Sequence, residues 1–207
     1  KGQSFPGYLL GKRRIGTVTK LRLFWILTLT AVLAQTPWPT EGVLAQETGF
    51  GSKKIVPFVP TPQEVVEGML ELAQVKKGDV VYDLGSGDGR IVVTAAKKYG
   101  ARAVGFEIDP DLIKQSREAV QKEGLEHLAE IREQDILTVD LSGASVVTMY
   151  LLPDVNMRLR PNVLSQLKPG SRVVSHAFDM GDWKPDKVER VNGRTVYLWT
   201  IPPKGMP

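Results

Sequence analysis

The chain has 207 residues, of which 42% are hydrophobic and 24% are charged, and this length suits one α/β domain with a sizeable core. It contains no cysteine, which excludes disulfide scaffolds, thiolate zinc sites, iron–sulfur clusters and cysteine nucleophiles. With His127 and His176 as its two histidines, the chain also lacks the residues of a multi-histidine metal centre, and we expect no metal cofactor.

The formal charge of +4 is unevenly distributed along the chain. Residues 1–45 hold six Lys/Arg and one acid, whereas residues 46–207 hold 21 Lys/Arg and 22 Asp/Glu. A protein that binds phosphate backbones needs a basic face on its folded domain. Because the excess of positive charge belongs to the first 45 residues, we expect no nucleic-acid partner.

Residues 1–45 are predicted to be a signal peptide or a membrane anchor. Lys20 and Arg22 precede the apolar run Leu23–Ala34, and small residues come after it, which is typical of secretory signals. The run is short for a full membrane span of about 20 residues. A buried helix of the fold is the alternative, although two prolines separate the run from the rest of the chain. The domain is therefore expected to be membrane-associated or exported. In the alternative arrangement, the segment tethers the domain to the membrane and leaves it on the cytoplasmic side.

Residues 46–60 are rich in Gly, Ser, Lys and Pro and are predicted to be a linker into one folded domain at 61–207. From residue 61 onward, strand and helix patterns alternate, which is typical of βαβ units around a parallel sheet. Thr61 is predicted to cap the first helix, with Pro62 in its first turn.

The predicted elements follow one another in chain order. Apolar spacing indicates helices at 63–74, from the glycine loop (residues 85–89) to Tyr99, at 111–122 and at 154–167, the last interrupted by Pro161. Short apolar runs indicate strands at 80–84, 103–106, 129–132, 145–149 and 172–175. Residues 187–191 and 195–201 flank Asn192-Gly193, a strong hairpin dipeptide. We therefore expect an α/β fold whose mostly parallel sheet ends in a C-terminal antiparallel hairpin.

The strongest functional pattern is Asp-Leu-Gly-Ser-Gly-Asp-Gly-Arg at residues 83–90, between a predicted strand and a predicted helix. Glycines at such a junction permit a tight turn and let a ligand approach the backbone at the helix N-terminus. Glu107 ends the next predicted strand, where a carboxylate can accept two hydrogen bonds from ribose hydroxyls. Together these features predict a nucleoside-binding site.

The order of the glycines discriminates between nucleotides. The dinucleotide fingerprint G-x-G-x-x-G requires a small residue where Arg90 stands. Asp83 precedes the first glycine by two residues, and a carboxylate there repels a pyrophosphate but suits a cation. The sequence contains no G-x-x-x-x-G-K-[ST] loop for a nucleoside triphosphate. The pattern favours a positively charged nucleoside, and S-adenosylmethionine is such a molecule.

At these residues the chain resembles class I S-adenosylmethionine-dependent methyltransferases, which have a Rossmann-like sheet and a first motif similar to residues 83–89. The resemblance covers about residues 55–201. It implies that the glycines approach the cofactor, that Glu107 holds the ribose and that Asp135 holds the adenine amino group. The cofactor-binding residues that it implies are Asp83, Gly85, Ser86, Gly87, Gly89, Glu107 and Asp135. For each of the acids, a solvated strand end is the alternative.

Residues 57–62 (Pro-Phe-Val-Pro-Thr-Pro), 83–91 and 183–186 (Trp-Lys-Pro-Asp) carry a narrower resemblance. They are similar to the lysine methyltransferases that modify mitochondrial ATP synthase c-subunit and adenine nucleotide translocase, and to their bacterial relatives. That group also has a hydrophobic segment before its catalytic domain. The resemblance implies a protein substrate methylated on lysine, and association with a membrane. The alternatives are a small-molecule or lipid methyltransferase and a non-catalytic nucleoside-binding module.

Methyl transfer from a sulfonium is an in-line displacement, so positioning and desolvation supply most of the catalysis. A lysine acceptor, with an ordinary pKa of about 10.4, must first lose its proton. The acceptor is expected beyond the strand at 145–149, where Tyr150 begins Tyr-Leu-Leu-Pro and is the candidate catalytic residue. This sequence departs from the Asn/Asp-Pro-Pro-Tyr/Phe motif of methyltransferases that act on nucleobases or glutamine, which disfavours those acceptors.

Several other residues near the predicted site have two interpretations each. Phe58 and Thr61 cover the cofactor and the methyl channel, or Thr61 is only a helix cap. His176 is a substrate contact or proton acceptor, or a structural histidine. Trp183 is a lid over the acceptor, or it packs against the C-terminal hairpin. Tyr150 itself is alternatively an aromatic residue that packs on the sheet edge, and the general base stays unassigned.

Overall fold

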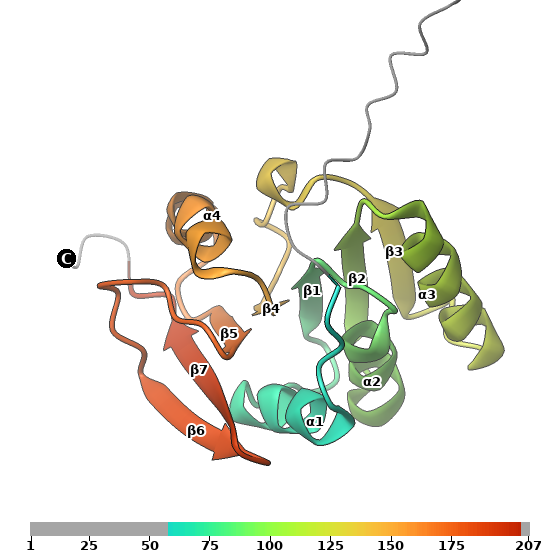
Figure 1. The fold of residues 1–207 in the computed structure, drawn as a ribbon, viewed down its shortest axis with the longest axis horizontal. Coiled ribbons are helices and arrows are strands. Elements are labelled where there is room, and N and C mark those ends of the chain that lie inside the picture. Colours follow the sequence, from blue (N-terminus) through green and yellow to red (C-terminus); the bar gives the residue numbers. More distant parts are fainter. Residues whose placement is uncertain (1–57, 204–207) are drawn as a thin grey trace, which may run out of the picture. The chain divides into compact units, whose positions relative to one another are not determined.

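Seven strands form one sheet in residues 58–203, the part of the chain that this computed structural model describes (Figure 1). Their order across the sheet is β3-β2-β1-β4-β5-β7-β6. The strands are β1 (Val80–Leu84), β2 (Arg102–Glu107), β3 (Ala129–Glu133), β4 (Val146–Met149), β5 (Arg172–His176), β6 (Lys187–Val191) and β7 (Arg194–Thr200). The first five pair in parallel, and β7 pairs antiparallel with both β5 and β6.

This topology confirms the expected α/β class, with a mostly parallel sheet and a C-terminal antiparallel hairpin. At the hairpin, Asn192 and Gly193 have φ values of 48° and 74°, the left-handed conformations that a two-residue type I′ turn requires. The predictions of a signal or anchor at 1–45 and of a linker up to residue 57 lie outside the described residues. No helix within residues 58–203 combines the length and the apolar character needed to cross a membrane.

The helices that connect the strands begin close to the predicted positions. They are α1 (Gln63–Leu72), α2 (Arg90–Tyr99), α3 (Pro110–Lys122) and α4 (Pro153–Gln166), and a 3-10 turn, η1 (Ile136–Thr138), precedes β4. The predicted cap of α1 is wrong, because Pro62 occupies the N-cap position and no side chain caps this helix. Thr61 is buried, with its hydroxyl oxygen 3.2 Å from Nδ1 of His176. Its side chain therefore serves a contact across the fold.

The fourth helix, α4, is continuous through Pro161, so the predicted interruption is also wrong. A proline in a helix interior removes one backbone hydrogen bond and costs about 3 kcal/mol. The inner face of α4 buries Val155, Leu159 and Val163 completely. Burial of one such side chain is worth about 1.5–3 kcal/mol, so the packing of this face outweighs the local cost of the proline.

The sheet separates two hydrophobic cores. Helices α1, α2 and α3 cover one face, where Met69 is fully buried, and α4 covers the other, where Trp199 is fully buried (Figure 1). Neighbouring residues of one strand, such as Val146 and Val147, contribute to different cores, as the two-residue period of a strand requires. Because β1, β2 and β4 are parallel, the loops that follow them lie at the same edge of the sheet, outside both cores.

Candidate functional site

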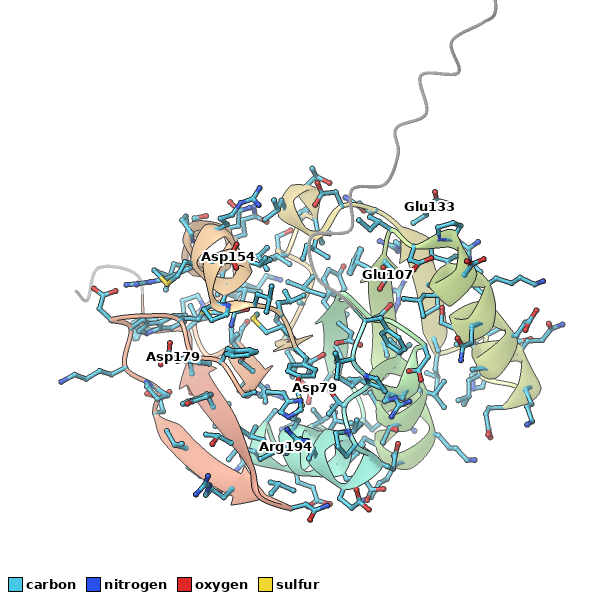
Figure 2. The ribbon with its side chains drawn as sticks, viewed as in Figure 1. Asp79, Glu107, Glu133, Asp154, Asp179 and Arg194 are labelled. Atoms are coloured by element: carbon cyan, nitrogen blue, oxygen red, sulfur yellow. The ribbon has the colours of Figure 1, made fainter. Side chains whose placement is uncertain are left out.

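A pocket lies at the C-terminal ends of β1, β2 and β4. Its lining includes Asp83, Gly85, Ser86, Gly87, Glu107, Asp135 and Tyr150, all of them predicted from the sequence. Parallel strands present their carboxyl ends at the same edge, which is why residues so distant in the sequence meet here. In Figure 2, Glu107 lies at the end of β2, and Asp154 and Asp179 lie on the other side of β4.

Three glycines after β1 have left-handed backbone conformations, with φ values of 76° at Gly85, 53° at Gly87 and 80° at Gly89. A Cβ atom on Gly87 would lie 2.4 Å from the ring of Phe58, so this ring packs directly on bare backbone. A Cβ atom on Gly89 would lie 2.8 Å from Cβ of Ser116 in α3. Gly89 is not among the lining residues of the pocket, and in this structure its missing side chain lets α3 approach the loop.

Asp83, near the end of β1, has a buried carboxylate that forms no ion pair with a basic side chain in the described part of the chain. Its Oδ1 accepts a hydrogen bond of 2.8 Å from the hydroxyl of Thr148 in β4. Burial raises the pKa of Asp83 to about 7, against the effect of this hydrogen bond, and the nearby charges of Glu107 and Asp88 add to the rise. A cation in the pocket would therefore stabilise the ionised form of Asp83.

Glu107 ends β2 and ties that strand to the glycine loop. Its Oε2 accepts a hydrogen bond of 2.9 Å from the backbone N–H of Gly87. Its Oε1 accepts bonds of 2.8 and 3.0 Å from the backbone N–H groups of Ile108 and Asp109. A carboxylate has about four acceptor positions and three are used here, so Glu107 keeps one position for a ribose hydroxyl, and a second such bond would have to replace one of the backbone bonds.

Asp135 comes after β3 and lines the same pocket. Its Oδ1 accepts a hydrogen bond of 2.9 Å from the backbone N–H of Leu137 and so caps η1. This bond fixes the direction of the side chain. The Oδ2 atom makes no hydrogen bond within residues 58–203, which leaves it as an acceptor for the predicted contact with adenine.

Tyr150, directly after β4, forms another part of the lining. The centre of its ring lies 4.0 Å from that of His176 and 6.3 Å from that of Phe178. His176 ends β5 and is 1% exposed. Burial, together with the charge of Arg194, lowers the pKa of His176 to about 4, so its imidazole is neutral at physiological pH. Tyr150 thus lines the pocket and packs on aromatic neighbours at the same time.

Trp183 packs against the C-terminal hairpin. Its ring centre lies 5.7 Å from that of Trp199 in β7, and its carbonyl oxygen accepts a hydrogen bond of 2.8 Å from Nε1 of Trp199. Trp183 is not among the residues that line the pocket. Of the two interpretations of this residue, the structure agrees with packing.

Sequence reasoning missed the contributions of Arg90 and Thr148. Arg90 donates from Nη1 to the carbonyl oxygen of Thr61 at 2.8 Å and from Nε to the carboxylate of Asp88 at 2.9 Å, so it fastens the segment before α1 to the glycine loop. In the sequence, Arg90 served only to exclude the dinucleotide fingerprint. Thr148 could have been noticed in the sequence as a polar residue within an apolar strand. In the structure it is buried and bonds Asp83.

The lining of the pocket fits S-adenosylmethionine. Gly85 and Gly87 line the pocket without side chains, and Asp83 favours a positive charge nearby. Glu107 and Asp135 keep acceptor capacity for hydroxyl and amino groups. Leu112 and Ile136 add apolar walls, as expected of a site that encloses a nucleoside.

Comparison with known proteins relates the chain to one family. A family model described as the ANTKMT methyltransferase domain matches residues 83–187. A protein-lysine N-methyltransferase of Saccharolobus islandicus (strain REY15A) is 47% identical over 151 residues, covering 70% of this chain and 94% of that protein. The lysine N-methyltransferase of Homo sapiens that is named for the ATP synthase c-subunit is 34% identical over 173 residues, covering 83% of this chain and 70% of that protein.

A solved structure is also similar over most of its length. It is described as an RNA methyltransferase from Salinibacter ruber in complex with S-adenosyl-L-homocysteine, and it matches with a TM-score of 0.70 and 56% sequence identity. The match covers 72% of this chain and 97% of that chain. The segment matched by the family model contains the glycine loop, Glu107, Asp135 and Tyr150.

Proposed function

This chain belongs to the ANTKMT methyltransferase domain family, and from that membership we propose that it transfers a methyl group to the side-chain amine of a lysine in a protein. It is a methyltransferase of Rossmann-like fold, and its methyl donor is S-adenosylmethionine. The observation that carries the proposal is a single pocket lined by both the glycine loop with Asp83 and, beyond β4, Tyr150. The relative that is 47% identical is named as a protein-lysine N-methyltransferase.

In this proposal the cofactor end of the pocket is formed by the glycine loop and three carboxylates. When bound, S-adenosylmethionine supplies an activated methyl group on a sulfonium. The carboxylate of Asp83 favours that positive charge. Glu107 accepts hydrogen bonds from the ribose hydroxyls, and Asp135 accepts one from the adenine amino group. Gly85 and Gly87 let the cofactor lie against the backbone, and Ser86 lines the pocket between them.

The acceptor end has to hold a neutral lysine amine in line with the methyl carbon. Leu151 and the ring of Tyr150 line this end, and desolvation beside them lowers the pKa of a lysine from its ordinary value of about 10.4. Tyr150 orients the incoming amine with its ring or its hydroxyl. Alignment of the two reactants contributes up to about 7–11 kcal/mol to such a reaction, so positioning residues carry most of the catalysis.

Methyl-labelled S-adenosylmethionine separates the proposed acceptor from its alternatives. The full chain is incubated with the labelled cofactor and a cell extract, and label is counted in protein, RNA and extractable lipid. Labelled peptides are then mapped by mass spectrometry. We expect label on lysine side chains. Label confined to lipid or to small molecules, or binding of the cofactor without any transfer, contradicts the proposal.

RNA is the second candidate acceptor, because the solved structure that is 56% identical is described as an RNA methyltransferase. The charge of the chain argues against it, since residues 46–207 hold 21 basic and 22 acidic side chains and offer no excess of positive charge to a phosphate backbone. Label that appears in the RNA fraction and is released by ribonuclease would favour this second candidate.

We also propose that residues 1–45 attach the protein to a membrane or direct its export, ahead of the methyltransferase domain at 61–207. The support is the apolar run Leu23–Ala34 behind a basic flank. Flotation with anionic vesicles compares the full chain with a chain that begins at Gln46. We expect only the full chain to float, and equal recovery of both below the vesicles contradicts attachment.

A further inference from the structure

The side chain of His176 is enclosed by the fold, with 1% of the residue exposed. Its Nδ1 lies 3.2 Å from the hydroxyl oxygen of Thr61, and its Nε2 has no hydrogen-bond partner among residues 58–203. A buried polar atom without a partner costs about 1–3 kcal/mol. A leucine or phenylalanine at this place would avoid that cost, so the imidazole calls for an explanation beyond the filling of space.

The imidazole packs against Tyr150, the residue that we assign to the acceptor. The two ring centres are 4.0 Å apart and the ring planes are inclined by 36°. The ring of Phe178 is also near, with its centre 6.3 Å from that of Tyr150 and its plane inclined by 19°. Aromatic pairs at such separations are attractive. Two rings from the end of β5 therefore restrict the direction of Tyr150 at the end of β4.

The backbone between His176 and Phe178 is strained. Ala177 has a φ of 66°, a left-handed conformation that costs a residue with a Cβ atom about 1–2 kcal/mol. The N–H of Phe178 donates to the carbonyl oxygen of His176 at 2.8 Å and closes a tight turn. Strain of this kind persists only where neighbouring groups enforce it, and it collects at functional sites. Here the turn brings the ring of Phe178 to Tyr150.

Two fully buried side chains enforce the turn. The hydroxyl of Ser175 donates to the carbonyl oxygen of Phe178 at 2.5 Å. Asn156, which lies on α4, donates from Nδ2 to the carbonyl oxygens of Phe178 and Asp179 at 3.3 and 3.1 Å. The strained turn is therefore held by both α4 and β5, and it does not depend on the loop alone.

Thr61 connects His176 to the cofactor end of the pocket. Its hydroxyl faces the imidazole, while its carbonyl oxygen accepts a hydrogen bond of 2.8 Å from Arg90. Arg90 in turn binds the carboxylate of Asp88, which lies within the glycine loop. A continuous series of contacts thus runs from the glycine loop through Arg90 and Thr61 to His176 and Tyr150.

We propose that His176 is a positioning residue for methyl transfer, which holds the ring of Tyr150 at the acceptor end and ties it through Thr61 to the loop that binds the cofactor. This inference rests on the proposed function, since it assigns Tyr150 to the acceptor amine. His176 does not take the proton of the lysine in this assignment, because its Nε2 is enclosed and burial lowers its pKa to about 4, far below the pKa of an amine.

Two substitutions separate the ring of His176 from its polarity. His176→Gln removes the ring and keeps a polar side chain, whereas His176→Phe keeps a ring against Tyr150. We expect His176→Gln to lower kcat for the acceptor about tenfold or more, while the Kd for S-adenosylhomocysteine stays within about twofold of the wild-type value. We expect His176→Phe to recover part of the loss, because its ring can pack on Tyr150 but cannot bond the hydroxyl of Thr61. His127→Gln, at an exposed position, is the matched control and keeps the wild-type kcat.

An unchanged kcat in His176→Gln overturns the proposal. So does a parallel loss of kcat, of affinity for S-adenosylhomocysteine and of melting temperature, because a residue that merely supports the fold would produce that result. Turnover is measured on whichever fraction the wild-type chain labels. Label outside protein lysines would thus contradict the proposed function and leave the comparison of the variants intact.

A crystal structure of the His176→Gln variant with S-adenosylhomocysteine gives a readout that needs no turnover. We expect the ring of Tyr150 to leave the position that it holds against residue 176, while the glycine loop keeps its conformation. A ring of Tyr150 in the wild-type position overturns the proposal whatever the acceptor is.

Discussion

Burial shifts the pKa values of Asp83 and His176 in opposite directions. It raises the pKa of Asp83 to about 7 and lowers the pKa of His176 to about 4. In both residues it disfavours the charged form. The consequence differs between the two residues, because a cation in the pocket restores the charge of Asp83, whereas His176, enclosed behind Tyr150, stays neutral throughout the physiological range.

The affinity for S-adenosylmethionine is expected to rise with pH as Asp83 ionises. Because burial raises the pKa of Asp83 to about 7, each pH unit below that value should weaken binding of the cation about tenfold. Calorimetric titration between about pH 5.5 and 7.5 measures this dependence. Asp83→Asn should bind more weakly and with little dependence on pH, whereas Asp140→Asn, at an exposed position, should keep the wild-type profile.

The same shift has a consequence for stability, with the opposite sign. The folded protein retains the proton of Asp83 up to a pKa of about 7, whereas the unfolded chain loses it near the ordinary pKa of about 3.9. The contribution of Asp83 to the free energy of unfolding is therefore largest at acid pH and is lost between these values. An Asp83→Asn variant with an unaltered slope over this interval would contradict the assignment.

Gly87→Val is expected to abolish the binding of S-adenosylhomocysteine, because Gly87 lines the pocket, so its new side chain and the ring of Phe58, 2.4 Å from the added Cβ, would compete for the space of the ligand. Gly124→Val is the matched control, since Gly124 also has a positive φ, 66°, but has nothing within 4 Å of the added atom. Both substitutions carry a backbone cost of about 1–2 kcal/mol. Calorimetry should find binding lost in the first variant alone, and equal losses would refute the steric explanation.

The glycine loop could be predicted because its spacing encodes a local backbone requirement, which the left-handed conformations satisfy. Contacts across the fold could not be predicted in this way. Thr61 and His176 are 115 positions apart, and Asp83 and Thr148 are 65 positions apart. Each pair meets only because of the order of the strands in the sheet. The residues next to either partner in the sequence do not predict that order.

At the scale of the elements, periodicity located each strand and helix to within two residues, and the differences have local as well as tertiary causes. The first helix ends at Leu72, and the chain reverses at Gln74, which has a φ of 51°. Pro161 is the clearest difference. A proline within a helix does destabilise it locally, but the burial of one face of α4 outweighs this cost.

Pro161→Ala is expected to raise the free energy of unfolding by about 1–3 kcal/mol, because alanine restores a backbone N–H to the interior of α4. The substitution leaves the buried face intact, since Pro161 is exposed. Chemical denaturation measures the change. Pro110→Ala at the start of α3 is the control without this gain, because an N–H at that position has no partner within the helix. A Pro161→Ala protein no more stable than the wild type would contradict the explanation.

At the scale of the molecule, both hydrophobic cores are built from residues 65–201. A chain that begins at Gln46 is therefore expected to fold with a melting temperature within about 2 °C of the full chain and with the same affinity for S-adenosylhomocysteine. Thermal unfolding and calorimetry make the comparison. A large loss of stability or affinity would mean that residues 1–45 belong to the fold of the domain.

The position of β7 between β5 and β6 has a consequence for the order in which the protein is synthesised. Every residue that lines the pocket precedes Leu152 in the chain, whereas the strand beside His176 begins only at Arg194. The ribosome therefore completes all the residues that line the pocket before it synthesises β7, the strand that pairs with β5 beside His176. A product terminated before Arg194 would hold every residue that lines the pocket but would lack Val196 and Trp199, which are buried in the two cores, so premature termination is expected to cost the fold and, with it, the binding of the nucleoside.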